Sequence, residues 1–177
     1  WSADFQKGLA AAYRGDFATA LNEWEPLAEQ GNVGAQYNLG QMYRRGEGVL
    51  QDYKIALKWY RLSAKQGFAS AQLNLGMMYE KGYGVVQNYK FALKWYRLSA
   101  EQGFTSAQLN LGLMYGKGQG VIQDNIYAHM WLNISAFNGN KNAVKGRGII
   151  AKRMTSADIT MAQKLARECV EKKYKGC

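Results

Sequence analysis

The chain has 177 residues, 47% of them hydrophobic, and carries a formal net charge of +10 at pH 7. This apolar content permits a substantial buried core. No run of about 18 apolar residues occurs, so the sequence excludes a transmembrane helix.

A short pair of helices is predicted first, between residues 5 and 31. Gly15-Asp16, a turn-forming pair, separates its two halves. The pair shares a register with the longer units that follow it, through Leu9, Tyr13, Ala20 and Gly31. We therefore expect a shortened N-terminal version of the same unit.

Three copies of one 36-residue unit come next. The sequence AQYNLG at residues 35–40 recurs as AQLNLG at residues 71–76 and at residues 107–112. A period between 20 and 50 residues marks an array of supersecondary units stacked side by side. We expect the three repeats at residues 34–67, 70–103 and 106–139.

Each copy is predicted to form two helices joined by a loop. Leu39 and Tyr43 are spaced i,i+4 and share a face, as the buried positions of a helix do. A Gly-x-Gly sequence at residues 46–48 then ends the first helix. The N-cap of the second helix is expected at Asp52, Asn88 and Asp124.

Gly40, Gly76 and Gly112 fall inside the first predicted helix of each copy. A glycine inside a helix costs about 1 kcal/mol relative to alanine. We expect the close approach of a neighbouring helix to compensate for that cost.

After residue 139 the repeat pattern decays. Lys141 to Lys152 is expected to form a degenerate first helix, with Ala143 in the repeat register. Thr155-Ser156-Ala157-Asp158 resembles a capping box and is expected to start a last helix that runs to about Lys173. Such atypical end units are expected in a repeat array, whose terminal repeats expose one polar face.

Taken together, the repeated positions read Ala-x-x-x-Leu-Gly-x-x-Tyr-x-x-Gly-x-Gly-Val-x-x-Asp, then Ala-x-x-Trp and a closing Gly. This pattern resembles the Sel-one-like repeat, a relative of the tetratricopeptide repeat. The segment from Lys141 departs from it at the Leu-Gly and Tyr positions. The resemblance implies an all-α fold, an α-solenoid in which stacked antiparallel helix pairs form a right-handed superhelix that ends in a C-terminal capping helix. It implies a single repeat domain over residues 1–177 that acts as an adaptor or scaffold.

In related repeats the first helix of each pair lines a concave groove that binds a protein or peptide. Carried over by position, the groove residues would be Tyr37, Asn38, Gln41, Arg44, Leu73, Asn74, Met77, Lys81, Leu109, Asn110, Leu113 and Lys117. Helix geometry supports part of this set, because Tyr37, Gln41 and Arg44 share a face opposite the buried stripe.

The asparagines of this set recur once per copy, at Asn38, Asn74 and Asn110. An amide side chain offers both donors and acceptors and could hold the backbone of an extended peptide. Alternatively, these side chains bond to neighbouring turns and fix the stacking. Met77, Leu109 and Leu113 are open to the same two interpretations.

Positive charge is concentrated at the C-terminal end of the chain. Residues 141–177 hold 10 Lys and Arg against 3 Asp and Glu, and residues 1–140 hold 13 against 10. The basic segment could attract an acidic partner, a membrane surface or a nucleic acid. We favour the alternative interpretation, in which it is the solvated face of a capping helix. It contains no nucleic-acid motif, and we expect no specific nucleic-acid partner.

The two cysteines, Cys169 and Cys177, match a spacing that forms a disulfide in cysteine-rich relatives of this family. A continuous helix would separate them by about 12 Å along its axis, whereas a disulfide needs Cα atoms within about 7 Å. The helix must therefore end near Lys173, with Tyr174 to Gly176 folding back. The bridge would imply a periplasmic or secreted protein; the alternative is two free thiols in a frayed tail.

No catalytic set is visible, and we expect neither an enzyme, a cofactor nor a metal site. His129 is the only histidine, and no Gly-x-Ser-x-Gly or Ser-x-x-Lys motif accompanies it. One histidine and two terminal cysteines cannot supply a regular zinc site. The main hypothesis is thus a monomeric protein-binding scaffold. The alternatives are a cell-wall-related or β-lactam-binding enzyme or enzyme modulator and, more weakly, a nucleic-acid-binding protein.

Overall fold

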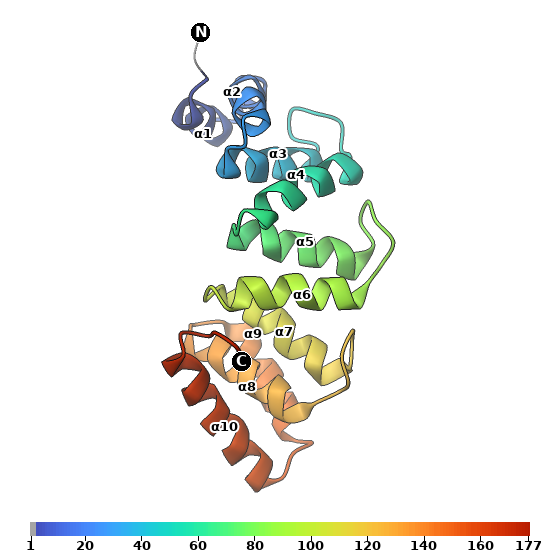
Figure 1. Ribbon diagram of the computed structural model, residues 1–177, viewed down its shortest axis with the longest axis vertical. Coiled ribbons are helices and arrows are strands. Elements are labelled where there is room, and N and C mark those ends of the chain that lie inside the picture. The colour runs from blue at the N-terminus through green and yellow to red at the C-terminus, as the bar shows by residue number, and fades with distance from the viewer. Residues whose placement is uncertain (1–2) are drawn as a thin grey trace. The chain divides into compact units, whose positions relative to one another are not determined.

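The computed structural model describes residues 3–177, and every regular element in that range is an α-helix (Figure 1). The chain divides into two compact units, which we call the N-terminal unit (residues 3–87) and the C-terminal unit (residues 88–177). The N-terminal unit contains α1 (Phe5–Tyr13), α2 (Phe17–Glu29), α3 (Val33–Arg45), α4 (Tyr53–Lys65) and α5 (Ala69–Lys81). The C-terminal unit contains α6 (Tyr89–Ala100), α7 (Thr105–Lys117), α8 (Asn125–Phe137), α9 (Lys141–Ala151) and α10 (Ser156–Glu171). None of these helices is long and apolar enough to cross a membrane.

Helices of the N-terminal unit pack on one another in chain order, α1 on α2 and so on to α5. Their core is built from alanine, larger aliphatic and aromatic side chains, among them Ala11, Leu39 and Trp24. A buried carboxylate joins the first two helices: Glu23 on α2 accepts a hydrogen bond of 2.8 Å from the backbone N–H of Asp4 and pairs with Lys7 at 2.6 Å. The expected helix pair between residues 5 and 31 is therefore present, as part of an all-α solenoid.

Each second helix of the three long repeats begins at the predicted N-cap. Asp52, Asn88 and Asp124 have extended backbone angles, and their side chains accept hydrogen bonds from the N–H groups two or three residues later. Each first helix ends at a left-handed glycine, Gly46, Gly82 or Gly118. The predicted capping residues are confirmed at all these positions.

The second glycine of each Gly-x-Gly loop has a packing role as well. Gly84 has φ +67°, and a Cβ placed on it would overlap the backbone of Tyr53, the first residue of α4. Gly120 lies in the same way on the first residue of α6, Tyr89. Each loop therefore rests on the start of the second helix of the preceding repeat, at a distance that only glycine permits.

Glycines inside the first helices allow the second helix of the same repeat to approach closely, as expected. A Cβ on Gly40 would lie 2.7 Å from the ring of Tyr60 on α4, and one on Gly112 would lie 2.8 Å from Leu132 on α8. The close approach of the second helix thus compensates for the helix propensity that glycine lacks. The prediction is confirmed at these two positions.

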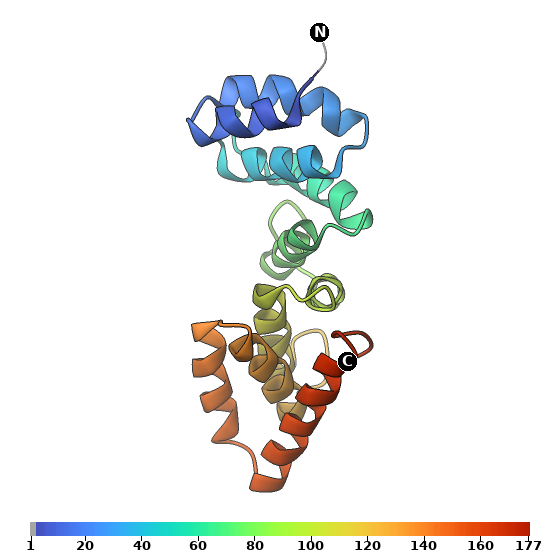
Figure 2. The ribbon, with the colours of Figure 1, turned by 90° about the vertical axis from the view of Figure 1, so that its left-hand side faces the viewer.

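In the C-terminal unit, α6 to α9 pack in chain order, but α10 does not follow them. It packs on α8, and α9 also packs on α8 (Figure 2). The capping box at the start of α10 is confirmed, since Thr155 and Asp158 bond reciprocally. The helix ends at Glu171, two residues earlier than predicted, because Lys173 and Tyr174 adopt positive φ angles and turn the chain back.

That turn brings the two cysteines together. Cys169 and Cys177 form a disulfide with a Cα–Cα distance of 5.7 Å. The enclosed Tyr174 lies against the turns of two repeats: its ring is 3.3 Å from the Cβ position of Gly103, and its hydroxyl accepts a 3.4 Å hydrogen bond from Asn138. The disulfide thus holds the tail against the edge of the repeats.

Candidate binding groove

The first helices of the repeats have one face that is fully engaged in stacking. On this face a buried glutamine opens each copy, and its side-chain amide donates to a carbonyl near the end of the preceding helix. The three pairs are Gln36 to Ala28 at 3.1 Å, Gln72 to Ala64 at 3.2 Å and Gln108 to Ala100 at 3.3 Å. Sequence reasoning missed this role, although the recurring Ala-Gln dipeptide was its signal.

Further polar bonds join the two helices of one repeat. The hydroxyl of Ser63 donates to the carbonyl of Val33 at 3.0 Å, and that of Ser135 donates to the carbonyl of Thr105 at 2.9 Å. Gln66 donates to the buried Gln36 at 2.8 Å. The stacking within a unit is therefore fixed by glutamine and serine side chains.

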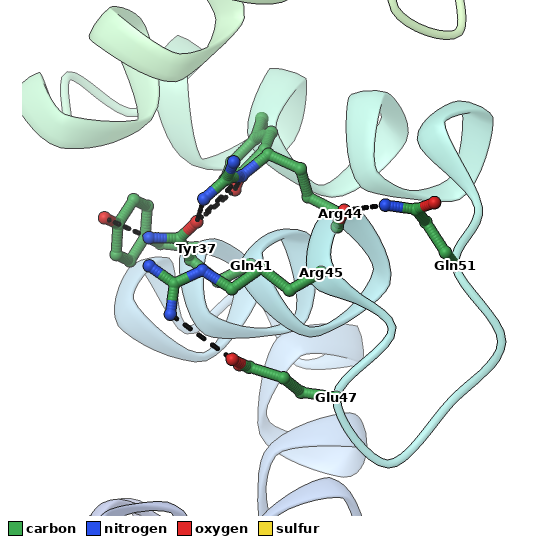
Figure 3. A network of polar contacts seen from close by, with 7 residues as sticks. Tyr37, Gln41, Arg44, Arg45, Glu47 and Gln51 are labelled. Atoms are coloured by element: carbon green, nitrogen blue, oxygen red, sulfur yellow. Dashed lines mark hydrogen bonds and ion pairs between the residues drawn. The ribbon is translucent and has the colours of Figure 1, made fainter.

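The opposite face of α3 carries the predicted groove residues of the first long repeat, and three of them form one polar network (Figure 3). The amide of Gln41 donates to the hydroxyl of Tyr37 at 2.9 Å. Its oxygen accepts from Arg44 at 3.0 Å and from the hydroxyl of Tyr60 on α4 at 2.7 Å. Gln41 thus orients the side chains on both sides of it.

Aromatic contacts hold Tyr37 in place within this network. Its ring centroid lies 5.1 Å from that of Phe68, edge to face, and 5.9 Å from that of Tyr60. Burial raises the pKa of Tyr60 well above its ordinary value, and the hydrogen bond from Arg44 opposes that shift. The Tyr60 hydroxyl therefore remains a neutral donor to Gln41 across the physiological pH range.

A pocket of about 300 Å³ opens beside this network in the N-terminal unit. Its walls come from α1, α2, α3 and the loop that follows α3. The lining residues are Leu9, Ala12, Tyr13, Phe17, Trp24, Tyr37, Asn38, Gln41, Met42, Arg45 and Glu47. Three of the predicted groove residues are among them, whereas the contributions of α1 and α2 were not predicted.

The pocket lining combines apolar side chains, such as Leu9 and Trp24, with the charged side chains of Arg45 and Glu47. Tyr13, which also lines the pocket, is 89% exposed, so its ring is accessible to a ligand. Arg45 and Glu47 pair with each other at 3.4 Å (Figure 3). Since surface ion pairs contribute roughly 0–1 kcal/mol, a ligand group can replace either partner at little cost.

Asn38 lines this pocket, and its side-chain amide makes no hydrogen bond within the described chain. Its equivalents Asn74 and Asn110 are likewise half-buried on their helices without a side-chain partner in residues 3–177. The stacking bonds that these asparagines could have made are made by the glutamines two positions earlier. The stacking bonds are thus made by the glutamines, and a ligand contact by the asparagines stays a prediction.

The remaining predicted groove residues are half-buried or exposed on α5 and α7. Leu73, Met77, Leu109 and Leu113 are half-buried, and Lys81 and Lys117 are exposed in the last helical turn. Lys81 pairs with Glu80 at 3.1 Å. Leu113 is partly covered by α9, since a Cβ on Gly146 would lie 3.8 Å from it. These six positions stay predictions as ligand contacts.

His129 lies inside α8, only 4% exposed, and its Nδ1 has no hydrogen-bond partner among the described residues. Burial lowers its pKa, and the positive charge of Arg147 lowers it further. The described residues contain no group of three or more His, Cys, Asp or Glu side chains that could hold a metal ion.

Comparisons with known proteins agree with this architecture. The Sel1 repeat family model matches residues 33–68, 69–104 and 105–140, within one residue of the repeat boundaries expected from the sequence. No match was found among curated proteins.

Two solved structures show the same fold. A Sel1 repeat protein from Oxalobacter formigenes is 28% identical, with a TM-score of 0.74 over 94% of this chain and 75% of its own. A protective antigen present in uropathogenic Escherichia coli strains, displaying an SLR fold, is 27% identical, with a TM-score of 0.68 over 96% of this chain. The chain spans 46% of the length of that antigen. The chain is a member of the Sel1 repeat family.

Proposed function

We propose that this protein is a non-catalytic scaffold that captures an extended peptide segment of a partner protein in the pocket formed by α1, α2 and α3. Sel1 repeats are in general protein–protein interaction modules, which makes a protein partner the expected class. The observation that carries the proposal is Asn38, a half-buried amide that lines the pocket without an intramolecular partner.

An extended peptide presents alternating N–H and C=O groups, and one asparagine amide can donate to one and accept from the other. An amide that is left unpaired on binding would lose affinity, so this contact would also select for a correctly placed backbone. The exposed ring of Tyr13 and the side chain of Leu9 offer apolar surface to a neighbouring side chain. Recognition would therefore combine main-chain hydrogen bonds with one apolar anchor.

Asn74 continues the same position on α5, one repeat later in the same unit. We propose that it holds the next part of the bound segment, along with Leu73 and Met77. Within the C-terminal unit, we propose that Asn110, Leu109 and Leu113 on α7 make the same kind of contacts with a peptide. The disulfide is compatible with an extracytoplasmic location. We propose a periplasmic or secreted site of action.

Capture from a native extract tests the groove assignment. The double variant Asn38→Ala/Asn74→Ala should retain less than about a fifth of the partner bound by the wild type, because loss of one or two hydrogen bonds of about 1 kcal/mol each reduces affinity several-fold. Asn22→Ala is the matched control, since Asn22 is an exposed asparagine on α2 that does not line the pocket.

Gln36→Ala separates binding from folding. It removes the buried bond to Ala28, so it should lower the melting temperature, whereas the asparagine variant should leave it unchanged. Equal capture by wild type and asparagine variant would refute the groove. Hydrolysis of peptidoglycan or a β-lactam by the purified protein would refute the non-catalytic role.

A further inference from the structure

A second groove lies at the other end of the chain, in the C-terminal unit. Helices α9 and α10 both pack on α8 and share little contact with each other. Figure 2 shows them diverging from their connection at residues 152–155, α9 in orange and α10 in red. The pocket between them has a volume of about 440 Å³ and is lined by all three helices. A trough with one helix as its floor and two as its walls is the shape in which a further helix lies.

Comparison with the complete repeats shows that α9 lacks a second helix packed beside it. In α3 and α7 the inner glycine touches the second helix of its own repeat, through Gly40 and Gly112. In the segment from Lys141 the departure from the Leu-Gly pair is only partial: Arg147 replaces the leucine, but the glycine is retained as Gly148. A Cβ on Gly148 would meet nothing within 4 Å, because α10 packs on α8. The position of a second helix beside α9 is therefore open.

The open position is apolar. Val144 on α9 is 48% exposed, and it occupies the repeat position of Gln36, which bonds to the preceding helix at Ala28 and to Gln66 at the end of the second helix of its own repeat. Phe137 at the end of α8 is 83% exposed, and Val170 lies on the opposite wall. Exposed apolar side chains from three helices thus surround one trough.

The positive charge around the trough favours an acidic binding partner over a second copy of this chain. Arg147 donates only to the neutral side chain of Asn133, and Arg167 has no ion pair within the described residues. Glu171 is the single carboxylate in the lining. The surrounding segment, residues 141–177, has a net charge of +7. A second copy of the same chain would bring two such segments together, which like-charge repulsion opposes.

We propose that this trough is a docking site for an amphipathic helix of a partner protein, whose apolar face packs on Val144, Phe137 and Val170 and whose acidic residues pair with Arg147 and Arg167. The bound helix extends beyond the pocket lining over Gly148, which is one turn from Val144 on α9. The helix takes the place of the second helix that the last repeat does not supply. This site is separate from the pocket at α1 to α3, and it holds or fails independently of the function proposed above.

A synthetic helix tests the proposal directly. The probe is a fluorescein-labelled 18-residue peptide of Leu, Ala and Glu. Its leucines are spaced i, i+3, i+4 and i+7, so that they form one apolar face when the peptide is helical. Fluorescence anisotropy should show that the purified protein binds this peptide at least tenfold more tightly than a scrambled peptide of the same composition. A version with Lys in place of Glu should also bind at least tenfold more weakly.

Three substitutions locate the site. Gly148→Leu fills open space in the free chain, so it should leave the melting temperature intact or raise it, yet reduce peptide binding at least tenfold. Phe137→Glu should have a similar effect on binding without unfolding an already exposed position. Arg167→Glu should lower the affinity for the Glu-containing peptide and raise the affinity for the Lys-containing peptide. Met161→Glu is the control, since Met161 is 48% exposed on α10 but does not line the trough.

Several results would overturn the proposal. Equal affinity for ordered and scrambled peptides, or full binding by both Gly148→Leu and Phe137→Glu, would exclude a helix in this trough. A dimer in sedimentation velocity that Phe137→Glu dissociates would assign the surface to a second copy. Binding to phosphatidylglycerol vesicles without binding to the acidic peptide would assign it to a membrane. The variants at Asn38 and Asn74 should leave peptide binding unchanged.

Discussion

Two amide residues in each repeat, two positions apart, have opposite roles at the level of the single side chain. Gln36 and its equivalents are buried and bond to the preceding helix, whereas Asn38 and its equivalents are half-buried and make no such bond. An unsatisfied buried amide costs about 1–3 kcal/mol, so the glutamine cannot be released for a ligand. The half-buried asparagine makes no bond that a ligand would have to break, which is the reason we propose it as the ligand contact.

His129 gives the molecule a predictable dependence on pH. Its pKa in the folded chain lies below the ordinary value of about 6.5, because burial and Arg147 disfavour its charged form. The unfolded chain therefore binds more protons than the folded chain below about pH 6.5, and the free energy of unfolding falls as the pH drops. The slope is at most about 1.4 kcal/mol per pH unit, and it vanishes above about pH 7.

Urea denaturation between pH 5 and pH 7.5 measures this effect. His129→Gln should remove most of the slope in that window. The carboxylates with lowered pKa values, Asp16, Glu23 and Asp158, titrate at lower pH and do not interfere. A wild-type stability that is flat from pH 5 to pH 7.5 would contradict the burial of His129.

Loops and helix starts interlock at the level of the element. Each Gly-x-Gly loop uses its first glycine to end a helix and its second to rest on the start of the second helix of the preceding repeat. The glutamine that follows then closes the loop, as Gln51 does by donating to the carbonyl of Arg44 at 2.8 Å (Figure 3). The loop is therefore a packing element of the repeat as well as a connection.

Gly84→Ala tests this interlock. The substitution places a methyl group both in a left-handed conformation and against the backbone of Tyr53, so it should destabilise the chain by about 2–4 kcal/mol. Gly67→Ala is the matched control, with φ +92° and nothing within 4 Å, and should cost only about 1 kcal/mol. The comparison of the two melting temperatures isolates the packing contribution. Equal losses would show that the loop does not press on α4.

At the level of the whole molecule, the two ends of the chain are completed differently. The N-terminal unit begins with a short helix pair joined by the buried Glu23. The C-terminal unit ends with a helix that leaves the repeat register and a tail held by the disulfide. In a repeat array each repeat contacts only its neighbours, so the two terminal repeats need additional stabilising contacts.

Reduction of the disulfide measures how much the bridge at the C-terminal end stabilises the fold. Closing so short a loop contributes about 2–3 kcal/mol through the entropy of the unfolded chain. Dithiothreitol should therefore lower the melting temperature of the wild type and release Tyr174 from Gly103 and Asn138. The variant Cys169→Ser/Cys177→Ser should have the melting temperature of the dithiothreitol-treated wild type, and dithiothreitol should not change it. An unchanged wild-type melting temperature would show that the bridge does not stabilise the fold.

The sequence by itself determined the repeats, the helix caps and the inner glycines, because these depend on local backbone angles and on a period that recurs in the chain. Leu39, Gly40 and Asp52 could be assigned from spacing alone. The division of roles between Gln36 and Asn38 could not, since both are amides on one helix and only their surroundings separate them. The path of α10 was also decided in three dimensions: its pattern predicts a helix, but whether that helix packs on α8 or α9 depends on the competition between two surfaces. That choice leaves Gly148 uncovered and creates the trough.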